Sequence, residues 1–429
     1  MKRRLLPILM TLVLVCALPI WAAFVTSGDV TNPLVCTAGA TSPPDNAATR
    51  LKSAISNGGT VQLTEDIEIS ETLVVTRDVT LDLNGHVLKM TGDGSVLKVS
   101  DRATLTITDS RPQNPHTGPY GRLPAGGVIT GGEGTNVTGI YNVGGAVFLE
   151  NDTTLKLEGG TLTGNSGSSI YIGGATFVMS GGTITGEDIG VRSLLGTFKM
   201  TGGRITGCRD RGVYVYNGNM TMSGTAYIGE NPNARRGDIY VYESDHKHTD
   251  LSVTGGTIEG KVRIIFLESL HPTQDDLKAV ANSVVKEQCV FNGHIKVGID
   301  DRAGTSVDYN SVNFIDEVAK TRTRKLVLQP NAVEEPETPA TVNGQAFMYW
   351  AKEGVSEAWD FNTEIEVPLT LYAVRTPASS SGYYYYPTTD TKVDDAKDSP
   401  KTADPGVALY AALSLLSLTG LTCTTKKRF

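Results

Sequence analysis

Gly159-Gly160-Thr161-Leu162-Thr163-Gly164 begins a unit that recurs along the middle of the chain. It returns as Gly181-Gly182-Thr183-Ile184-Thr185-Gly186 and as Gly202-Gly203-Arg204-Ile205-Thr206-Gly207. Further copies start at Gly126-Gly127, Ser223-Gly224 and Gly255-Gly256. The steps between the second glycines are 33, 22, 21, 21 and 32 residues. The period is therefore about 21 residues, and two of the units carry an insertion of about eleven.

A short strand with alternating polarity precedes each Gly-Gly pair. Its apolar positions are Leu155 and Leu157, Phe177 and Met179, Phe198 and Met200, Met220 and Met222, and Leu251 and Val253. Because strand side chains alternate between two faces, these residues point inward and stack into a ladder from one unit to the next. A second ladder contains Leu162, Ile184, Ile205 and Ile258. A third contains Ile170 and Ile172, Ile189 and Val191, Val213 and Val215, and Ile239 and Val241.

Three short strands per unit, joined by glycine corners, predict an all-β fold. The expected architecture is a right-handed parallel β-helix with about 21–22 residues per coil and coils about 4.8 Å apart. Glycine suits the corners because the chain turns sharply there, often at positive φ. The main alternative is a helical repeat, but a Gly-Gly pair in every unit and abundant Thr and Val favour strands.

We predict that this β-helix occupies residues 46–265, after a leader over 24–45. Asn46–Ser56 has helical spacing and predicts an N-terminal cap over the open end of the solenoid. The first coils are expected as strands at Thr60–Leu63, Ile67–Ile69, Leu73–Val75, Val79–Leu83 and Leu105–Ile107. The segment Val79-Thr80-Leu81-Asp82-Leu83-Asn84-Gly85-His86 resembles the entry coils of pectate-lyase-like β-helix proteins.

The pattern changes after Gly260. Residues 266–329 predict a C-terminal cap or a small α+β unit, with a helix over Thr273–Glu287. Residues 330–341 are rich in Pro and Glu and predict a linker. Residues 376–398 are rich in Ser, Tyr and Asp and predict a wall-spanning tether.

Three aromatic motifs lie between that linker and that tether. They are Phe347-Met348-Tyr349-Trp350, Trp359-Asp360-Phe361-Asn362-Thr363 and Leu369-Thr370-Leu371-Tyr372-Ala373. Their order and spacing resemble the Listeria-Bacteroides repeat, the internalin B-type module of bacterial surface proteins. The resemblance covers residues 342–375 and implies a small β-grasp-like module.

Both ends of the chain carry targeting signals. Lys2-Arg3-Arg4, an apolar run over 5–20 and Ala22-Ala23 predict a secretory signal peptide over residues 1–23. At the other end, Ser399-Pro400-Lys401-Thr402-Ala403-Asp404 precedes an apolar tail over 407–423 and Lys426-Lys427-Arg428. An apolar tail with a basic end is retained in a membrane.

The C-terminal arrangement over 399–429 resembles the LPxTG-like sorting signal of Gram-positive cell-wall-anchored proteins. The resemblance implies that a sortase cuts between Thr402 and Ala403 and joins Thr402 to peptidoglycan. Ser399 stands where Leu is usual and Ala403 where Gly is usual, which leaves the sortase class open. An ordinary C-terminal membrane anchor is the alternative. The expected location is the cell wall, where the secreted chain is exposed at the surface and anchored to peptidoglycan after cleavage of the signal peptide and the sorting signal.

The charge of the chain is acidic. Removing residues 1–23 takes away three positive charges and removing 403–429 takes away a net two, which changes the net charge from -8 to -13. We therefore expect no nucleic-acid partner. Cys36, Cys208 and Cys289 would remain, and their wide spacing predicts neither a disulfide framework nor a zinc site, although one bridge stays open.

The sequence shows no convergent catalytic group. The acidic residues near the ladders, including Asp82, Asp210 and Asp238, are scattered and fit turns. Arg209-Asp210-Arg211 is the densest charged cluster and is expected as a solvated loop. His246 and His248 lie two residues apart, but no third ligand accompanies them. We expect no catalytic residue, no metal and no cofactor.

The third strand of each unit suggests a binding face. Between its inward residues, Tyr171, Tyr214 and Tyr240 form one outward column, with Gly190 in the corresponding place of its coil. Arg192, Tyr216 and Tyr242 form the neighbouring column. Tyrosines with an adjacent arginine are typical of surfaces that stack sugar rings. Packing between coils is the alternative role, and the helix at 273–287 could instead cover this face.

These features predict a wall-anchored surface protein that acts by contact rather than by catalysis. An adhesin that binds a glycan or a host ligand is the first expectation. The alternatives are a wall-bound polysaccharide lyase or glycoside hydrolase, and a structural spacer without a ligand.

Overall fold

The computed structural model describes residues 46–137, 140–231, 236–244, 251–286, 288–299 and 306–377. The signal peptide, the tether and the sorting signal that the sequence predicts lie outside these residues. These three segments stay predictions, and so does the sortase site at Ser399, Pro400, Lys401, Thr402 and Ala403.

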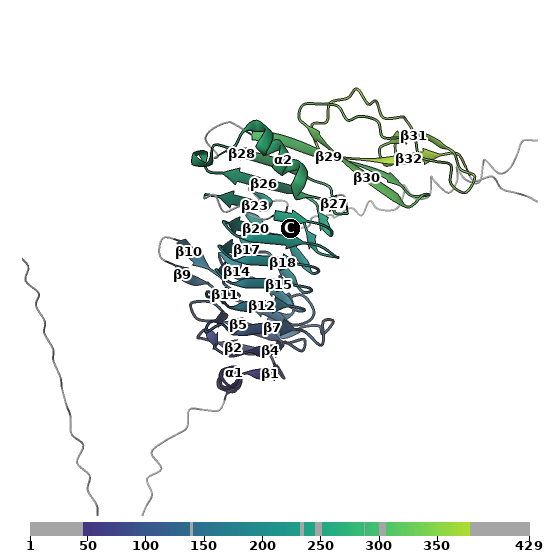
Figure 1. The fold of residues 1–429 in the computed structure, drawn as a ribbon. Helices are drawn as coiled ribbons and strands as arrows, with labels where there is room; N and C mark the ends of the chain where they lie inside the picture. The colour runs from purple at the N-terminus through teal and green to yellow at the C-terminus, as the bar shows by residue number, and fades with distance from the viewer. Residues whose placement is uncertain are drawn as a thin grey trace, which may run out of the picture. The chain divides into compact units, whose positions relative to one another are not determined.

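The described chain runs in turn through three sheets, called A, B and C here, as Figure 1 shows. Sheet A is ordered β1 (Gly59–Gln62), β4 (Val79–Asp82), β7 (Thr104–Thr108), β12 (Thr154–Leu157), β15 (Thr176–Met179), β18 (Thr197–Met200), β21 (Asn219–Met222) and β24 (Leu251–Val253). Sheet B is ordered β2 (Ile67–Ile69), β5 (Val87–Met90), β8 (Val128–Thr130), β13 (Thr161–Thr163), β16 (Thr183–Thr185), β19 (Arg204–Thr206), β22 (Tyr227–Ile228), β25 (Thr257–Ile258) and β27 (Val290–Phe291).

Sheet C is the longest of the three. Its order begins β3 (Leu73–Val75), β6 (Leu97–Val99), β11 (Val147–Leu149), β14 (Ser168–Gly173), β17 (Ile189–Leu194), β20 (Arg211–Tyr216), β23 (Gly237–Glu243), β26 (Lys261–Phe266) and β28 (His294–Ile299). It continues with β29 (Ser306–Asp316), β32 (Leu369–Arg375) and β31 (Phe347–Ala351), and β30 (Thr321–Leu328) pairs β29. Pairing is parallel through β28 and antiparallel between β28 and β29.

The prediction of an all-β fold made of successive parallel strands is confirmed at this level, and the fold is β-helix-like. The first predicted ladder is present, because Leu155, Phe177 and Phe198 pair in register and are fully buried. The Phe177 and Phe198 rings stack with centroids 4.9 Å apart. The second ladder is present too, and it gains Ile228 between Ile205 and Ile258. The sequence pattern did not identify Ile228, because its repeat, which starts at Ser223-Gly224, departs from the Gly-Gly consensus.

The two glycines of a corner have different tasks. A Cβ on Gly202 would lie 2.2 Å from the Ser180 carbonyl oxygen of the preceding coil, so the first glycine permits a close approach of backbones. Gly203 has φ +79°, so the second glycine supplies a left-handed turn. The repeated Gly-Gly pair is therefore a consequence of stacking coils at the distance between hydrogen-bonded strands.

The first long repeat contains the predicted insertion. It folds as an antiparallel hairpin of β9 (Thr135–Val137) and β10 (Ile140–Val143), placed between β8 and β11. Val137 and Val143 pack against Phe148 and Tyr171 on the outer side of sheet C. The hairpin therefore covers part of the face on which we expected a ligand site.

Two helices lie at the ends of the stack of parallel strands (Figure 1). Helix α1 (Ala47–Asn57) has Asn46 as its N-cap and contacts β1, β2 and β3 with its buried Leu51 and Ile55. Helix α2 (Gln274–Val284) begins with a capping box between Thr273 and Asp276. Both predicted helices are confirmed. Two single-turn 3-10 helices cover Gly118–Tyr120 and Glu268–Leu270.

Helix α2 does not cover the outer face of sheet C, which was one of the positions that the sequence analysis allowed for it. It contacts β24, β28 and β29, and its Leu277 joins the main hydrophobic core. A second, smaller core contains Phe314, Trp350 and Leu371, with Trp359 and Phe361 packed against it. The aromatic motifs of residues 342–375 thus share a core with β29, while their assignment to a separate module stays a prediction.

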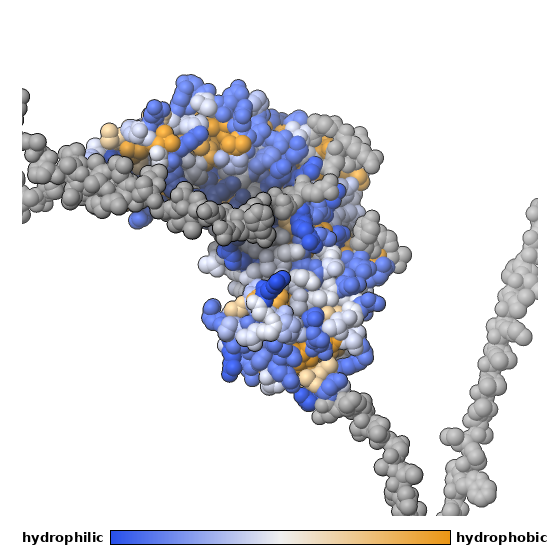
Figure 2. Space-filling view, turned by 180° about the vertical axis from the view of Figure 1, so that it is seen from behind, coloured by the Kyte–Doolittle hydropathy of each residue, from blue (hydrophilic) through white to orange (hydrophobic). Residues whose placement is uncertain are grey.

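The described surface is mainly polar. On the face shown in Figure 2, hydrophobic residues form small separate groups among hydrophilic ones. Among the described residues, the exposed large hydrophobic side chains are Val74, Leu195, Met348, Val355 and Val367. None of the helices in this part of the chain is long and apolar enough to span a membrane.

Candidate functional site

The strand register corrects the predicted columns on the outer face of sheet C. Tyr171 pairs with Arg192, Arg192 pairs with Tyr214, and Tyr214 pairs with Tyr240. Arg192 therefore belongs to the tyrosine column, and Gly190 does not. The hydrophobic pattern aligned β17 two residues out of register. The reason is that Ser193, a buried polar residue, fills the inward position that pairs with Ile172, where the pattern requires an apolar residue.

The neighbouring column is corrected in the same way. Leu194 takes the place that we predicted for Arg192, and it pairs with Gly173 on one side and with Tyr216 on the other. Tyr216 pairs with Tyr242 as predicted, and their rings stack with centroids 5.7 Å apart. The structure thus brings all six predicted residues onto one face but orders them differently.

The tyrosine column is also less open than a flat stacking surface. Tyr171 and Tyr240 are only 7% and 5% exposed, while Tyr214 is half-buried. The Tyr171 ring stacks on Phe148 with centroids 4.8 Å apart. Its face is therefore occupied, and only parts of these rings remain for a ligand.

Arginine side chains fill the spaces between the tyrosines. The Arg211 guanidinium lies 4.7 Å from the ring centroids of both Tyr214 and Tyr240. The Arg192 guanidinium lies 5.3 Å from the Tyr214 centroid. Cations over aromatic faces are held by the ring quadrupole, so the column is a mixed stack of tyrosine and arginine.

The expectation of a solvated Arg209-Asp210-Arg211 loop holds for its first residue alone. Arg209 is exposed and pairs with Asp188 at 2.8 Å. Arg211 is buried, and its Nη1 donates to Asp210 Oδ2 at 2.7 Å. Its tyrosine neighbours come from two different coils, and nothing in the local sequence indicated that contact.

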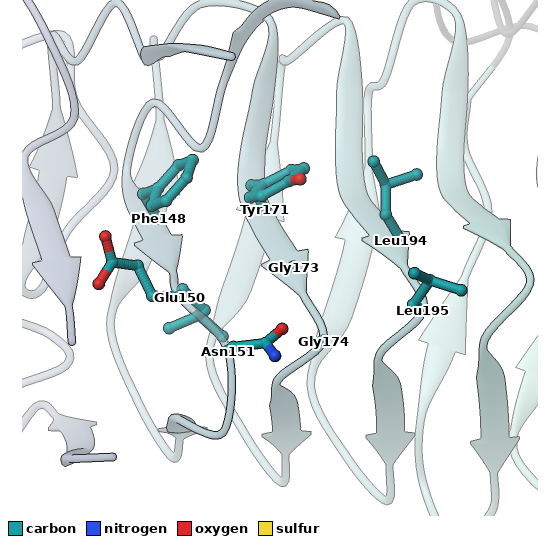
Figure 3. Close-up of a pocket in the computed structure, with 9 residues that line it drawn as sticks. Phe148, Glu150, Asn151, Tyr171, Gly173, Gly174, Leu194 and Leu195 are labelled. Atoms are coloured by element: carbon teal, nitrogen blue, oxygen red, sulfur yellow. The ribbon is translucent and has the colours of Figure 1, made fainter. Parts of the chain in front are cut away.

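An open pocket of about 600 Å³ lies beside this stack (Figure 3). Phe148 and Tyr171 form one wall, and Leu194 and Leu195, both of the next coil, form the opposite side. Gly173 and Gly174 lie between them, at the end of β14. A Cβ on Gly173 would lie 2.9 Å from the Tyr171 ring, so glycine allows the ring to lie across the strand.

Leu195 is an unusual member of the pocket wall. Leu195 is 62% exposed, and its backbone φ is +58°. At the matching corners, the neighbouring coils carry Gly174 and Asn217, which accept positive φ more readily. An exposed leucine in a left-handed conformation is unfavourable for stability on both counts, which suggests a role outside folding.

Polar groups at the pocket are available for hydrogen bonding. Within the described residues, neither the Asn151 amide nor the Tyr171 hydroxyl has a hydrogen-bond partner. Glu150, which also lines the pocket, is neutralised by Lys98 at 2.7 Å. An apolar wall with a few free donors and acceptors is the usual chemistry of a small-ligand site.

A second pocket gathers carboxylates that the sequence left scattered. Glu230, Asp238 and Glu259 line a cavity of about 350 Å³. The Tyr227 hydroxyl lies 3.1 Å from Glu230 Oε1 and 2.6 Å from Glu259 Oε2. Glu259 stands where the other repeats carry Thr163, Thr185 and Thr206, and this exception is the sequence signal that could have identified the pocket.

Asp238 is the buried member of this acidic pocket. Burial raises the pKa of its carboxyl, and the hydrogen bond from Asn231 only partly opposes that effect. Glycoside hydrolysis uses two carboxyl groups, of which the general acid has a raised pKa. No group of three or more potential metal ligands occurs within the described residues. The His246 and His248 pair lies outside them.

Comparisons with known proteins give no assignment: no protein-family model matches the chain, and no match was found among curated proteins or solved structures.

Proposed function

We propose that this chain is a non-catalytic surface protein that binds a glycan on the outer face of sheet C. The pocket between Phe148, Tyr171, Leu194 and Leu195 carries this proposal, because it combines an apolar wall with free polar groups. A sugar ring has an apolar C–H face and a rim of hydroxyls. The leucines would contact the face, while Asn151 and the Tyr171 hydroxyl would bond the rim.

The proposal extends to the architecture and the location. The three parallel sheets would be the sides of a right-handed parallel β-helix, and residues 342–375 would form a module of the Listeria-Bacteroides type. The sorting signal would attach the chain to peptidoglycan through Thr402. The proposal is supported by the repeat, by the aromatic motifs, and by the basic and apolar patterns at the two ends of the sequence.

Binding is tested with the purified protein on a glycan array, beside an Asn151→Ala/Leu195→Asn double variant. The matched control is Val367→Asn, since Val367 is also exposed, at 68%, but lies away from the pocket. We expect signals that the double variant loses and the control keeps. Signals that survive in the double variant would move the binding site elsewhere.

The runner-up function is cleavage of a polysaccharide, and the acidic pocket is the observation that favours it. The same array samples are assayed for released reducing and unsaturated sugars. Sugar release that Asp238→Asn abolishes would replace the binding proposal with a hydrolase or lyase. Absence of both binding and release would favour a structural spacer.

Wall attachment is tested separately by Thr402→Ala in a Gram-positive host that expresses sortase. We expect the unaltered chain in the fraction released from the wall by muramidase. The variant should appear in the membrane and medium instead. Equal wall fractions for both chains would contradict sortase attachment and favour an ordinary membrane anchor.

A further inference from the structure

The arginine stack beside the pocket carries more positive than negative charge. Arg211 and Arg236 share a single carboxylate, Asp210, at 2.7 Å and 3.5 Å. Arg192 faces the same carboxylate electrostatically, but among the described residues it makes no ion pair and no hydrogen bond. Among the described residues, three guanidinium groups therefore face this one carboxylate, in a chain of net charge -8.

Arg192 is the least satisfied of the three. Its Nε atom is buried without a hydrogen-bond partner, and burial lowers the pKa of its guanidinium. The Tyr214 ring occupies one face of the group and cannot accept strong in-plane hydrogen bonds. A guanidinium donates through its edge, in a fork that matches a carboxylate or a sulfate. Within the described residues, the edge of Arg192 therefore has donors that no protein acceptor satisfies.

The position of Arg192 connects this charge to the pocket. Arg192 pairs in register with Tyr171, which lines the pocket, and the next strand position after Arg192 on the outer face is Leu194, which lines it too. Neighbouring strands lie about 4.8 Å apart, so an anionic substituent on a sugar ring at Tyr171 has to reach across only one strand spacing. A ring held against Tyr171 and Leu194 would bring such a substituent to Arg192.

We propose that the pocket and Arg192 together select a glycan that carries an anionic substituent, a carboxylate or a sulfate. The ring lies in the pocket, and its anionic group accepts hydrogen bonds from the Arg192 guanidinium. This inference rests on the proposed glycan-binding function. The acidity of the whole chain opposes the binding of anionic polymers in general, so selectivity for an anionic glycan has to come from a local cationic site.

The test measures the dissociation constants of three soluble polymers at fixed and at varied salt. Dextran is neutral, dextran sulfate adds sulfate to the same backbone, and hyaluronan carries carboxylates. The variants are Arg192→Gln, which keeps a planar head for stacking on Tyr214, and Arg192→Lys, which keeps the charge without the fork. The matched control is Arg209→Gln, an exposed arginine of the next coil that pairs with Asp188.

We expect at least one anionic polymer to bind tenfold or more tightly than dextran at 0.15 M salt. Arg192→Gln should remove that preference by roughly 10- to 100-fold, as expected for a hydrogen bond between charged groups. It should also flatten the salt dependence of binding. Arg192→Lys should bind with intermediate affinity, and Arg209→Gln should match the unaltered chain within about threefold.

The outcomes separate this inference from the function on which it rests. Equal binding of dextran and its sulfate, unchanged in Arg192→Gln, overturns the inference and leaves glycan binding intact. A preference that Arg209→Gln removes as strongly as Arg192→Gln also overturns it, because it would reflect general charge. If no polymer and no arrayed glycan binds, the result overturns both this inference and the proposed glycan-binding function. If Arg192→Gln melts at a lower temperature, Arg192→Lys decides the outcome.

Discussion

At the scale of single residues, Leu195 shows a conflict between stability and exposure. The corresponding corners of the adjacent coils hold Gly174 with φ +65° and Asn217 with φ +46°. Leucine in this conformation places its Cβ close to the following carbonyl oxygen, at a cost of about 1 kcal/mol. Because the side chain is also exposed, its burial does not offset that cost.

Leu195→Asn should therefore stabilise the fold while it weakens ligand binding. We expect the free energy of unfolding to rise by about 0.5–1 kcal/mol, since asparagine tolerates positive φ. Urea denaturation measures the change, and the glycan array measures the loss of binding. The reverse exchange on the next coil, Asn217→Leu, is the control and should lower stability. A variant that is both more stable and fully active would contradict a functional role for Leu195.

Glu187 is a second residue in an unfavourable environment, because its surroundings oppose the ionised state of its carboxyl group. Its carboxylate is fully buried, and burial raises its pKa to about 8 despite hydrogen bonds from the Asn165 backbone and side-chain amides. Below about pH 4.5 both the folded and unfolded chains hold this proton. As the pH rises from there to about 8, the unfolded chain releases the proton and the folded chain keeps it, so stability falls.

Glu187→Gln should remove this loss of stability. We expect equal free energies of unfolding for the two chains at pH 4, and a growing advantage of the variant up to pH 8. The advantage should approach about 4–5 kcal/mol, since the pKa rises from 4.5 to about 8 and one pKa unit corresponds to about 1.4 kcal/mol. Urea unfolding at four pH values measures the difference. Glu158→Gln, at an exposed position, is the control, and its effect at pH 8 should be much smaller than that of Glu187→Gln.

At the scale of elements, the glycine corners determine how closely the coils stack. Gly202 needs no special φ, yet a Cβ there would meet the Ser180 carbonyl oxygen at 2.2 Å. Contacts that short require the backbone of one coil to move. At Gly202, as at Gly181 where a Cβ would lie 2.1 Å from the Glu158 carbonyl oxygen, space and not conformation limits the first position to glycine.

Gly202→Ala should destabilise the fold by about 1–3 kcal/mol, the usual cost of overpacking. The control is Gly121→Ala, where the nearest atom would lie at 3.4 Å and φ is -60°. Alanine there should be neutral or slightly stabilising. Thermal denaturation of both variants measures the effect. Equal melting temperatures would mean that the coils can separate locally without cost.

At the scale of the whole molecule, helix α1 closes one end of the parallel stack. Leu51 and Ile55 are buried against β1, β2 and β3, which are the first strands of the three sheets. Without the helix, those strands would present unpaired backbone groups and the end of the hydrophobic core. Exposed strand edges recruit other chains, so a solenoid needs such a cap.

Deletion of residues 46–57 should cause self-association. We expect dimers or larger species in size-exclusion chromatography with light scattering, at concentrations where the intact protein is monodisperse. Arg50→Ala is the control, because it removes the exposed contact with Glu65 and keeps the buried face of the helix. A deleted chain that keeps the mass of the intact one would show that α1 is dispensable as a cap.

The sequence by itself determined the features that repeat. The Gly-Gly period, the alternation of Phe177 and Met179 and the N-cap at Asn46 predicted strands, ladders and helices, because each depends on neighbouring residues and a fixed period. Regularity of this kind also predicted the outer face of sheet C and all six of its candidate residues.

Only the tertiary structure decided what depends on contacts between coils. The register that puts Arg192 between Tyr171 and Tyr214 depends on a buried serine, and a hydrophobic pattern does not record it. The pocket depends on the corner conformation of Leu195, and the acidic cavity joins residues from separate repeats. Such contacts are fixed by packing in three dimensions, where residues far apart in the chain become neighbours, so local patterns could not reveal them.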